Sequence, residues 1–293
     1  MSGSDFAFGI TDVALIENQR LLASSFTPFV SDDISKRVNP KSVLPEAKSI
    51  IVVCVPHDSS FFFKNLSSLG TCEDYHKKVR DVLQAIALEL AELHGAFKYK
   101  ILVDSPTLCE RSLAVRAGLG FFGKNGLVIS PEFGSRFNIG VMLTDIGPGT
   151  NPFPNALRTR RSRVSSRPFG VSEPTSEVAD VDGCPPGCNL CINACPNGAL
   201  SEGKPLDARR CISYLTQKEK LSAEEEKHLH GQLYGCDICQ NVCPKNSLFK
   251  ASHVNPLELV ELSDSEISEK FGHTAMSWKI NLLKRNAFIC NIC

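Results

Sequence analysis

Cysteine is the residue type whose spacing in this chain most directly predicts chemistry. Thirteen cysteines occur in 293 residues, and eight of them fall within about a fifth of the chain. They form two groups that each end in Cys-Pro, with one more cysteine between the groups. The first group is Cys184, Cys188, Cys191 and Cys195, the second is Cys236, Cys239 and Cys243, and Cys211 lies between them. Uneven placement in a chain that is neither short nor secreted favours metal ligation over disulfides.

The two groups predict two [4Fe-4S] clusters. In two-cluster ferredoxins, three thiolates of a cluster come from one turn, and the cysteine of a Cys-Pro pair ligates the other cluster. This rule gives one ligand set of Cys184, Cys188, Cys191 and Cys243, and a second of Cys195, Cys211, Cys236 and Cys239. Two departures stand out. The first gap has three intervening residues rather than two, and Cys211 completes a second group of only three cysteines.

Structural zinc is the main alternative, because it also uses paired cysteines. It does not explain the two Cys-Pro endings or the separate Cys211. Five cysteines remain, and we assign them no role, because isolated thiols are usually small buried apolar residues. They are Cys54, Cys72, Cys109, Cys290 and Cys293.

Charge and hydropathy limit the partners. Lys plus Arg and Asp plus Glu both total 32, so the net charge is zero and a polyanion would have to meet a local basic patch. The longest apolar run, residues 50–56, is far shorter than the roughly 20 residues that span a bilayer. The N-terminal residues lack a signal-peptide pattern. We therefore expect a cytoplasmic protein with no membrane partner.

The first half of the chain predicts an α/β domain over residues 1–146. Apolar residues at helical spacing predict a helix over 74–94, which Gly95 would end. Runs rich in β-branched residues predict buried strands at 49–55, 99–103, 127–130 and 138–144.

The second half divides by composition. Residues 147–182 are rich in Pro, Gly, Ser and Arg, which predicts a basic linker or, alternatively, a local phosphate-binding patch. Its arginines are Arg158, Arg160, Arg161, Arg163 and Arg167. Residues 183–250 would form a ferredoxin-like domain with both clusters. Residues 251–293 would form a short C-terminal helical segment, with helices near 256–271 and 277–292.

Gly118, Gly120 and Gly123 match the spacing of a dinucleotide-binding fingerprint. That motif needs a strand before the glycines and a helix after them. Here a predicted helix over 107–117 precedes them and a strand follows, so we reject nucleotide binding. The glycines instead imply close backbone approach, either to the protein's own sheet or to a flat, bulky ligand.

Seven further segments of the sequence match motifs of a known protein family. They are NPKSVLPEAKSII (39–51), DYH (74–76), VDSP (103–106), RAGLGFFGKN (116–125), PEFGS (131–135), LDARRCISYLT (206–216) and YGCD (234–237). With these segments, most of residues 35–250 resembles the epoxyqueuosine reductase family. Its members are cobalamin-dependent iron–sulfur enzymes that finish queuosine synthesis on tRNA.

The resemblance implies an α+β fold class, with a nitroreductase-like α/β domain that holds base-off cobalamin, followed by the ferredoxin-like domain. It implies that Asp104 is the proton donor and that the corrinoid neighbours are Tyr75, Asp104, Val128, Ser213 and Asp237. It further implies two-electron reduction of epoxyqueuosine to queuosine in a tRNA anticodon loop, with the epoxide oxygen lost as water. We expect an external low-potential electron donor and a monomeric enzyme.

The position of Asp104 suits an acid. It directly follows a predicted strand and precedes Ser105-Pro106, so its carboxyl group should project from a strand end. To hold a proton near neutrality, it would need burial beside the corrin. The alternative is an aspartate that caps the following helix.

Two other functions stay open. A corrinoid iron–sulfur reductase of small molecules, of the dehalogenase kind, would use the same cofactors, although such enzymes usually carry an export signal. A two-cluster electron-transfer module would need only the cysteines, which leaves the α/β domain and Asp104 unexplained.

Overall fold

The computed structural model describes residues 6–16, 33–57, 63–147, 183–246, 254–274, 276 and 279–292. The arginines of the predicted linker lie outside these ranges. The chain divides into two compact units. The sheet unit comprises Met1–Pro56, His76–Gly123 and Leu127–Pro185, and the cysteine unit comprises His57–Tyr75, Lys124–Gly126 and Pro186–Cys293. The cysteine unit therefore includes two segments from the first half of the sequence.

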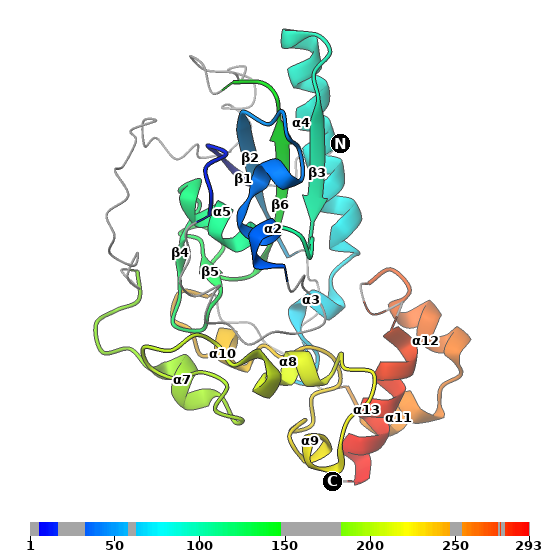
Figure 1. Cartoon of the computed structure of the whole chain (residues 1–293). Coiled ribbons are helices and arrows are strands. Elements are labelled where there is room, and N and C mark those ends of the chain that lie inside the picture. Colours follow the sequence, from blue (N-terminus) through cyan, green and yellow to red (C-terminus); the bar gives the residue numbers. More distant parts are fainter. Residues whose placement is uncertain are drawn as a thin grey trace. The chain divides into compact units, whose positions relative to one another are not determined.

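Four strands build the main sheet of the sheet unit, in the order β1-β2-β6-β3 (Figure 1). They are β1 (Ala7–Thr11), β2 (Ser49–Pro56), β3 (Tyr99–Val103) and β6 (Phe137–Thr144). Every neighbouring pair is antiparallel, and Val52 of β2 lies between Gly9 of β1 and Val141 of β6. The predictions of β2, β3 and β6 are confirmed. The sequence analysis missed β1, because this strand is short and is interrupted by a glycine.

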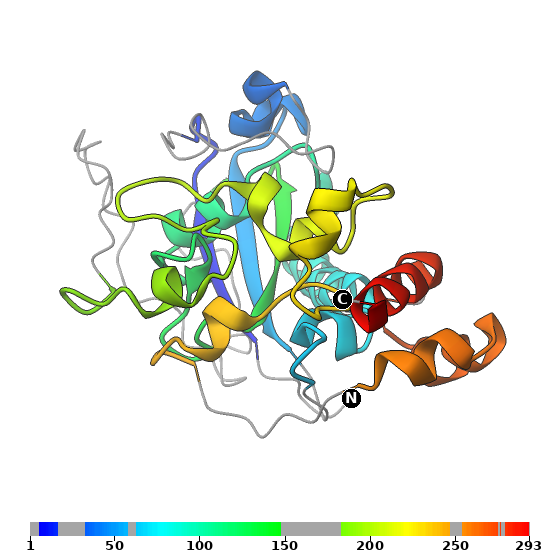
Figure 2. The same cartoon turned by 90° about the horizontal axis from the view of Figure 1, so that it is seen from below.

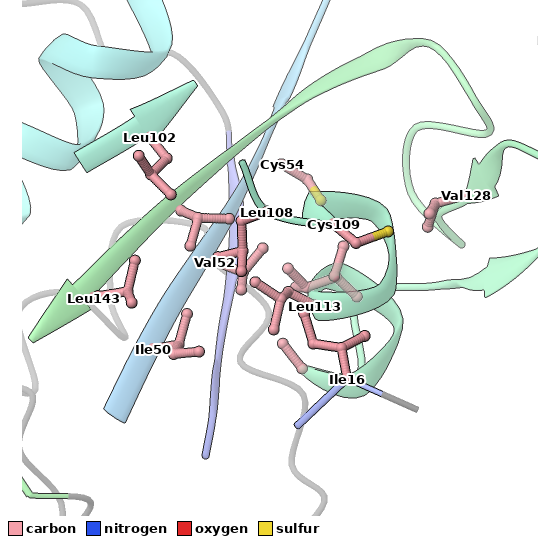
Figure 3. Packing of buried hydrophobic residues seen from close by; sticks show 14 of the residues in the cluster. Ile16, Ile50, Val52, Cys54, Leu102, Leu108, Cys109, Leu113, Val128 and Leu143 are labelled. Carbon is pink, nitrogen blue, oxygen red and sulfur yellow. The ribbon is translucent and has the colours of Figure 1, made fainter. Parts of the chain in front are cut away.

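Strand β2 is buried on both faces. Ile50, Val52 and Cys54 point to one face, where they pack with Leu113 of α5 (Glu110–Arg116) in the main core (Figure 3). On the other face lies α4 (Tyr75–His94), which matches the predicted helix and ends at Gly95 with a positive φ. A strand that is covered by helices on both faces has a continuous run of apolar residues instead of an alternating pattern, as β2 has.

Gly140 of β6 shows how closely α4 approaches the sheet. A Cβ atom at this position would lie 2.3 Å from Val79 Cγ1 and 2.9 Å from Leu83 Cδ1, and both of these helix side chains are fully buried. The glycine therefore makes room for the helix. Helix α4 on one face and α5 on the other give the sheet unit three layers.

The strand predicted at 127–130 is shorter and belongs elsewhere. It forms β5 (Val128–Ile129), which pairs with β4 (Phe121–Phe122) in a separate two-stranded sheet. The order of helix, glycines and strand is confirmed. A Cβ atom at Gly120 would lie 2.4 Å from the carbonyl oxygen of Ile129, so this glycine permits close approach to the protein's own hairpin.

The cysteine unit contains short helices joined by turns. Those around the cysteines are α3 (Ser68–Thr71), α7 (Leu190–Ala194), α8 (Ile212–Leu215), α9 (Ala223–Lys227) and α10 (Ile238–Asn241). Helices of one turn leave most backbone groups to be satisfied by caps and turns. They therefore present the side chains at their ends in several directions.

Three longer helices follow, coloured orange and red in Figure 2. They are α11 (Pro256–Glu261), α12 (Asp264–Phe271) and α13 (Ile280–Ile292). Leu259, Ile267 and Leu283 are completely buried and join them in one core. The predicted C-terminal helices are thus confirmed, except that the first is two helices. Ser263 separates them, because it forms a capping box with Glu266 at the start of α12.

The isolated cysteines behave as predicted where the structure describes them. Cys54, Cys72 and Cys109 are buried, and Cys290 packs against the core of α11–α13. The described cysteines are all free thiols. Within the described ranges, no helix combines the length and apolar character that crossing a bilayer requires.

Close packing of β1 against α5 gives a stability prediction. A Cβ atom at Gly9 would lie 2.4 Å from the carbonyl oxygen of Ala117, which is backbone and cannot rotate away. We expect Gly9→Ala to lower the free energy of unfolding by about 1–3 kcal/mol, measured by urea denaturation. Gly147→Ala is the matched control, because nothing lies within 4 Å of a Cβ atom there. Equal stability of the two variants would contradict this packing.

Candidate active site and cluster ligands

The eight clustered cysteines lie in or beside one-turn helices and turns. Cys191 is in α7 and Cys195 caps its C-terminal end, while Cys211 is the N-cap of α8. Cys239 is in α10, with Cys236 before this helix and Cys243 after it. All eight thiols are partly buried. Short helices and turns allow thiols to reach a cubane from different directions, as its ligation requires.

The structure brings the second predicted ligand set together. Cys236 interacts electrostatically with Cys211 and Cys195, and Cys239 interacts with Cys236 and Cys211. Cys191 of the first set also interacts with Cys239. Of the remaining cysteines in the first set, Cys188 and Cys243 belong to the cysteine unit and Cys184 to the sheet unit.

The environment of these thiols suits binding of a cationic group. Burial, together with the charges of Cys211, Asp237 and Cys195, raises the pKa of Cys236 to about 12, although a backbone hydrogen bond from Ile238 opposes the shift. Burial likewise raises the pKa of Cys211 and of Cys239. Metal ligation requires thiolates, and a nearby cation reverses this preference for the protonated form. To act as ligands, these clustered thiols would have to ionise together, and a bound cationic centre would balance the charge of the resulting thiolates.

The grouping differs from that of a single-ion site. Within the part of the chain that the structure describes, no three His, Cys, Asp or Glu side chains are arranged to hold one metal ion. A [4Fe-4S] cluster does not need such an arrangement, because each of its four thiolates ligates a different iron atom.

A buried threonine holds the turn before Cys236. The Gly235 N–H donates to Thr216 Oγ1 at 2.9 Å, and the carbonyl oxygen of Thr216 accepts from Asn286 Nδ2 of α13, also at 2.9 Å. Thr216 and Asn286 are both fully buried. Gly235 has a φ of 64°, which favours glycine. The sequence analysis missed Thr216 and Asn286 as partners, because no local signal links residues 70 positions apart.

Asp237 also has a defined role inside the cysteine unit. Its Oδ2 accepts from the backbone N–H of Ser68 at 2.8 Å, and its Oδ1 accepts from Gln240 Nε2 at 2.8 Å. The carboxylate thus links the start of α3 to α10. Each oxygen retains a second lone pair that could accept another hydrogen bond.

The other predicted corrinoid neighbours lie in both units. Tyr75 is buried at the start of α4, Val128 is buried in β5, and Ser213 is partly buried in α8. Contact of these residues with a corrinoid stays a prediction.

Asp104 directly follows β3, as the sequence predicts. It has a φ of 51°, in the left-handed region that Asp tolerates better than most residues. Its side chain is exposed, so the burial expected for a proton donor is absent from the structure of the sheet unit. The capping alternative is wrong, because α5 begins at Glu110 and its N-cap is Cys109.

Glu110 is a second carboxyl group beside Asp104 that the sequence analysis missed. Its Oε1 accepts the backbone N–H of Ser105 at 3.0 Å, and the carboxyl group also interacts with the peptide group of Asp104. Burial raises the pKa of Glu110 to about 8, and the charge of Asp104 raises it too, whereas the backbone hydrogen bonds and Arg111 oppose the shift. An acidic residue in the first turn of a helix usually indicates only an interaction with the helix dipole, so no sequence signal distinguishes this role of Glu110.

This raised pKa predicts a pH-dependent stability. Between pH 4.5 and about 8, the folded protein keeps a proton on Glu110 that the unfolded chain loses. The free energy of unfolding therefore falls as pH rises through this window, by at most about 1.4 kcal/mol per pH unit. We expect the Tm of Glu110→Gln to fall less than that of the wild type between about pH 5 and pH 8. Exposed Glu92→Gln is the control and should follow the wild type; parallel curves for all three proteins would contradict the prediction.

Two family models match separate parts of the chain. The model described as "4Fe-4S double cluster binding domain" matches residues 184–246. The model described as "Epoxyqueuosine reductase QueG, DUF1730" matches residues 37–105. The first match supports paired [4Fe-4S] clusters and disfavours structural zinc. The second match ends one residue after Asp104.

Known proteins match nearly the whole chain. Epoxyqueuosine reductase of Bacillus cereus is 35% identical over 94% of this chain and 71% of its own length. A solved structure of the Bacillus subtilis enzyme, whose catalytic aspartate loop is swung out of the active site, has a TM-score of 0.72 at 30% identity and covers 97% of this chain and 76% of its own. An epoxyqueuosine reductase solved with an epoxyqueuosine-modified tRNA-Tyr stem loop has a TM-score of 0.71 at 30% identity, with the same coverage.

These relatives align with most of the length of the chain, and their alignment is not confined to the double-cluster match at residues 184–246. An aligned share of 94–97% of the chain is too large to leave out either unit. The chain belongs to the epoxyqueuosine reductase family.

Proposed function

We propose that this protein is an oxidoreductase that converts epoxyqueuosine to queuosine in tRNA. The observation that carries the proposal is the 35% identity to a named epoxyqueuosine reductase over 94% of the chain, which includes Asp104 and all eight clustered cysteines. A shared cluster domain alone would support only electron transfer. Identity across the sheet unit as well supports the same substrate chemistry.

The clusters would be held by the two ligand sets given by the cysteine spacing. Cys195, Cys211, Cys236 and Cys239 would hold one [4Fe-4S] cluster, and Cys184, Cys188, Cys191 and Cys243 the other. The thiols of Cys195, Cys211, Cys236 and Cys239 interact with one another, which supports their assignment to one cluster. When bound, the clusters would pass single electrons from an external low-potential donor.

Cobalamin would be the centre that reacts with the substrate, held base-off by a nitroreductase-like domain over residues 1–146. Bound cobalamin supplies a metal centre that can attack carbon. The residues that would contact it are Tyr75, Val128, Ser213 and Asp237. Tyr75 and Val128 carry apolar side chains of the kind that pack on a corrin ring, and Ser213 and Asp237 carry polar groups that could bond to its amide side chains.

Asp104 would supply the proton. Removing an epoxide oxygen consumes two electrons and two protons and yields an alkene and one water molecule. The side chain is exposed at the end of β3, so that bound cofactor and substrate could reach it.

The substrate would be a tRNA anticodon loop. A related enzyme has been solved with an epoxyqueuosine-modified stem loop, which supports recognition of this part of tRNA. Because the chain has no net charge, a local basic patch would have to bind the phosphates, and the arginines of residues 147–182 are candidates. We also propose that the enzyme acts in the cytoplasm as a monomer.

Metal analysis tests the cofactors first. After anaerobic reconstitution with iron, sulfide and cobalamin, we expect about eight iron atoms and about one cobalt atom per chain. The same sample should convert epoxyqueuosine in tRNA when it is given a strong reductant. Eight iron atoms without cobalt would instead favour the electron-transfer module. Cobalt uptake with activity only on small halogenated compounds would favour the dehalogenase-like reductase.

Replacement of the acid tests the mechanism. We expect Asp104→Asn to retain iron, cobalt and tRNA binding but to lower turnover at least about 100-fold, because general acids typically contribute that much. Turnover is measured as queuosine formed per enzyme, by mass spectrometry of digested tRNA. Asp81→Asn is the matched control, since Asp81 is an exposed residue of α4 paired with Lys77. Normal turnover of Asp104→Asn would remove Asp104 from the mechanism.

A further inference from the structure

We propose that Glu110 is a positioning residue for Asp104, which holds the backbone of the proposed proton donor in its left-handed turn. This inference rests on the proposed function for the role of Asp104. The hydrogen bonds themselves are independent of that function, because they are part of the fold of the sheet unit.

The Glu110 carboxyl group binds the turn directly after Asp104. It accepts the backbone N–H of Ser105 at 3.0 Å, and the peptide group of Asp104 interacts with the same carboxyl group. The bond to Ser105 fixes the peptide group that joins Asp104 to Ser105, and with it the orientation of the backbone that carries Asp104. A shift of this backbone would move the Asp104 carboxyl group with it.

Glu110 is itself firmly anchored. It is the first residue of α5, and Leu113 and Ala114 in the same helix are fully buried in the main core. The helix therefore provides a fixed reference for its carboxyl group. In contrast, Asp104 is exposed and lies beyond the last hydrogen-bonded residue of β3.

The turn needs such an anchor. Left-handed backbone is unfavourable for a residue with a Cβ atom and persists when its surroundings fix it. Ser105 and Thr107 bond with each other, with their hydroxyl oxygens 2.7 Å apart, and Ser105 Oγ accepts the N–H of Thr107 at 3.2 Å. These contacts shape the segment internally. The bonds to Glu110 tie it to the helix.

Three variants test the proposal. Glu110→Ala removes both acceptor oxygens, while Glu110→Gln keeps a carbonyl oxygen that can still accept an N–H. Val115→Ala is the control for general loss of packing, because Val115 lies in the same helix and packs against the same core. Each variant is reconstituted with both cofactors, and single-turnover reduction and tRNA affinity are measured well below its Tm.

We expect Glu110→Ala to lower the single-turnover rate about 10- to 100-fold with unchanged tRNA affinity, since small misplacements of a reacting group have effects of that size. Glu110→Gln should stay within about threefold of the wild type, and Val115→Ala within about twofold. A normal rate for Glu110→Ala would overturn the proposal. A loss of rate in Val115→Ala as large as that in Glu110→Ala would also overturn it, because general loosening would then explain both.

A double variant separates positioning from other roles. If Glu110 acts through Asp104, the Asp104→Asn/Glu110→Ala protein should be no slower than Asp104→Asn alone. A further tenfold loss in the double variant would show that Glu110 acts on something else and would overturn the proposal.

Hydrogen exchange gives a readout that does not depend on activity. In the protein without substrate, the amides of Asp104 and Ser105 should exchange at least about tenfold faster in Glu110→Ala than in wild type or Val115→Ala. Unchanged exchange would overturn the claim that Glu110 holds the turn. Full activity of Asp104→Asn would instead remove the donor assigned under the proposed function, and exchange would still decide whether Glu110 holds the turn.

Discussion

The structure of the sheet unit is determined by the burial of the apolar strand β2, which must be covered on both faces. All of its residues from Ser49 to Val55 are buried, so the strand requires a neighbour on each edge and a helix on each side. Strands β1 and β6 supply the edges, while α4 and α5 supply the faces. Once α5 is packed on the core, Glu110 at its first position and Asp104 at the end of β3 are brought together. The acidic pair is thus a consequence of the way the core is closed.

The cysteine unit follows a different rule. Its helices around the cysteines are only four or five residues long, and polar contacts such as those of Thr216 and Asp237 hold them in place. Short helices contribute little stability by themselves. The clustered thiols are costly to ionise without a cation, so bound clusters would both neutralise them and cross-link the turns that carry them.

The sequence predicted those parts of the fold that have strong local signals. Strands β2 and β6 and helix α4 have long apolar patterns, and the cysteine groups have a spacing that few other sites require. The prediction missed β1, because its alternation is broken by Gly9. The prediction also made the strand at 127–130 longer than the observed β5. The β-branched residues there indicate a strand, but they do not show that its partner β4 has only two residues.

The part of the candidate site that could be predicted is the set of cluster ligands, because cluster binding restricts the spacing of cysteines along the chain. Thiol ligands must occur in sets, so the sequence indicated them together. Glu110 instead binds a backbone N–H, which every residue except proline has, so no residue type marks its partner in the sequence. The bond from Asn286 to Thr216 joins residues 70 positions apart, which only the folded chain reveals.

The bond between Asn286 and Thr216 also imposes an order on the biogenesis of the protein. Thr216 accepts the N–H of Gly235, directly before Cys236, and is itself held by Asn286 of α13. Because α13 follows Cys236 in the chain, a ribosome makes the turn that carries Cys236 before it makes the helix that supports this turn. The cluster that uses Cys236 would therefore gain a firmly held ligand only after α13 has been synthesised and has folded against Thr216.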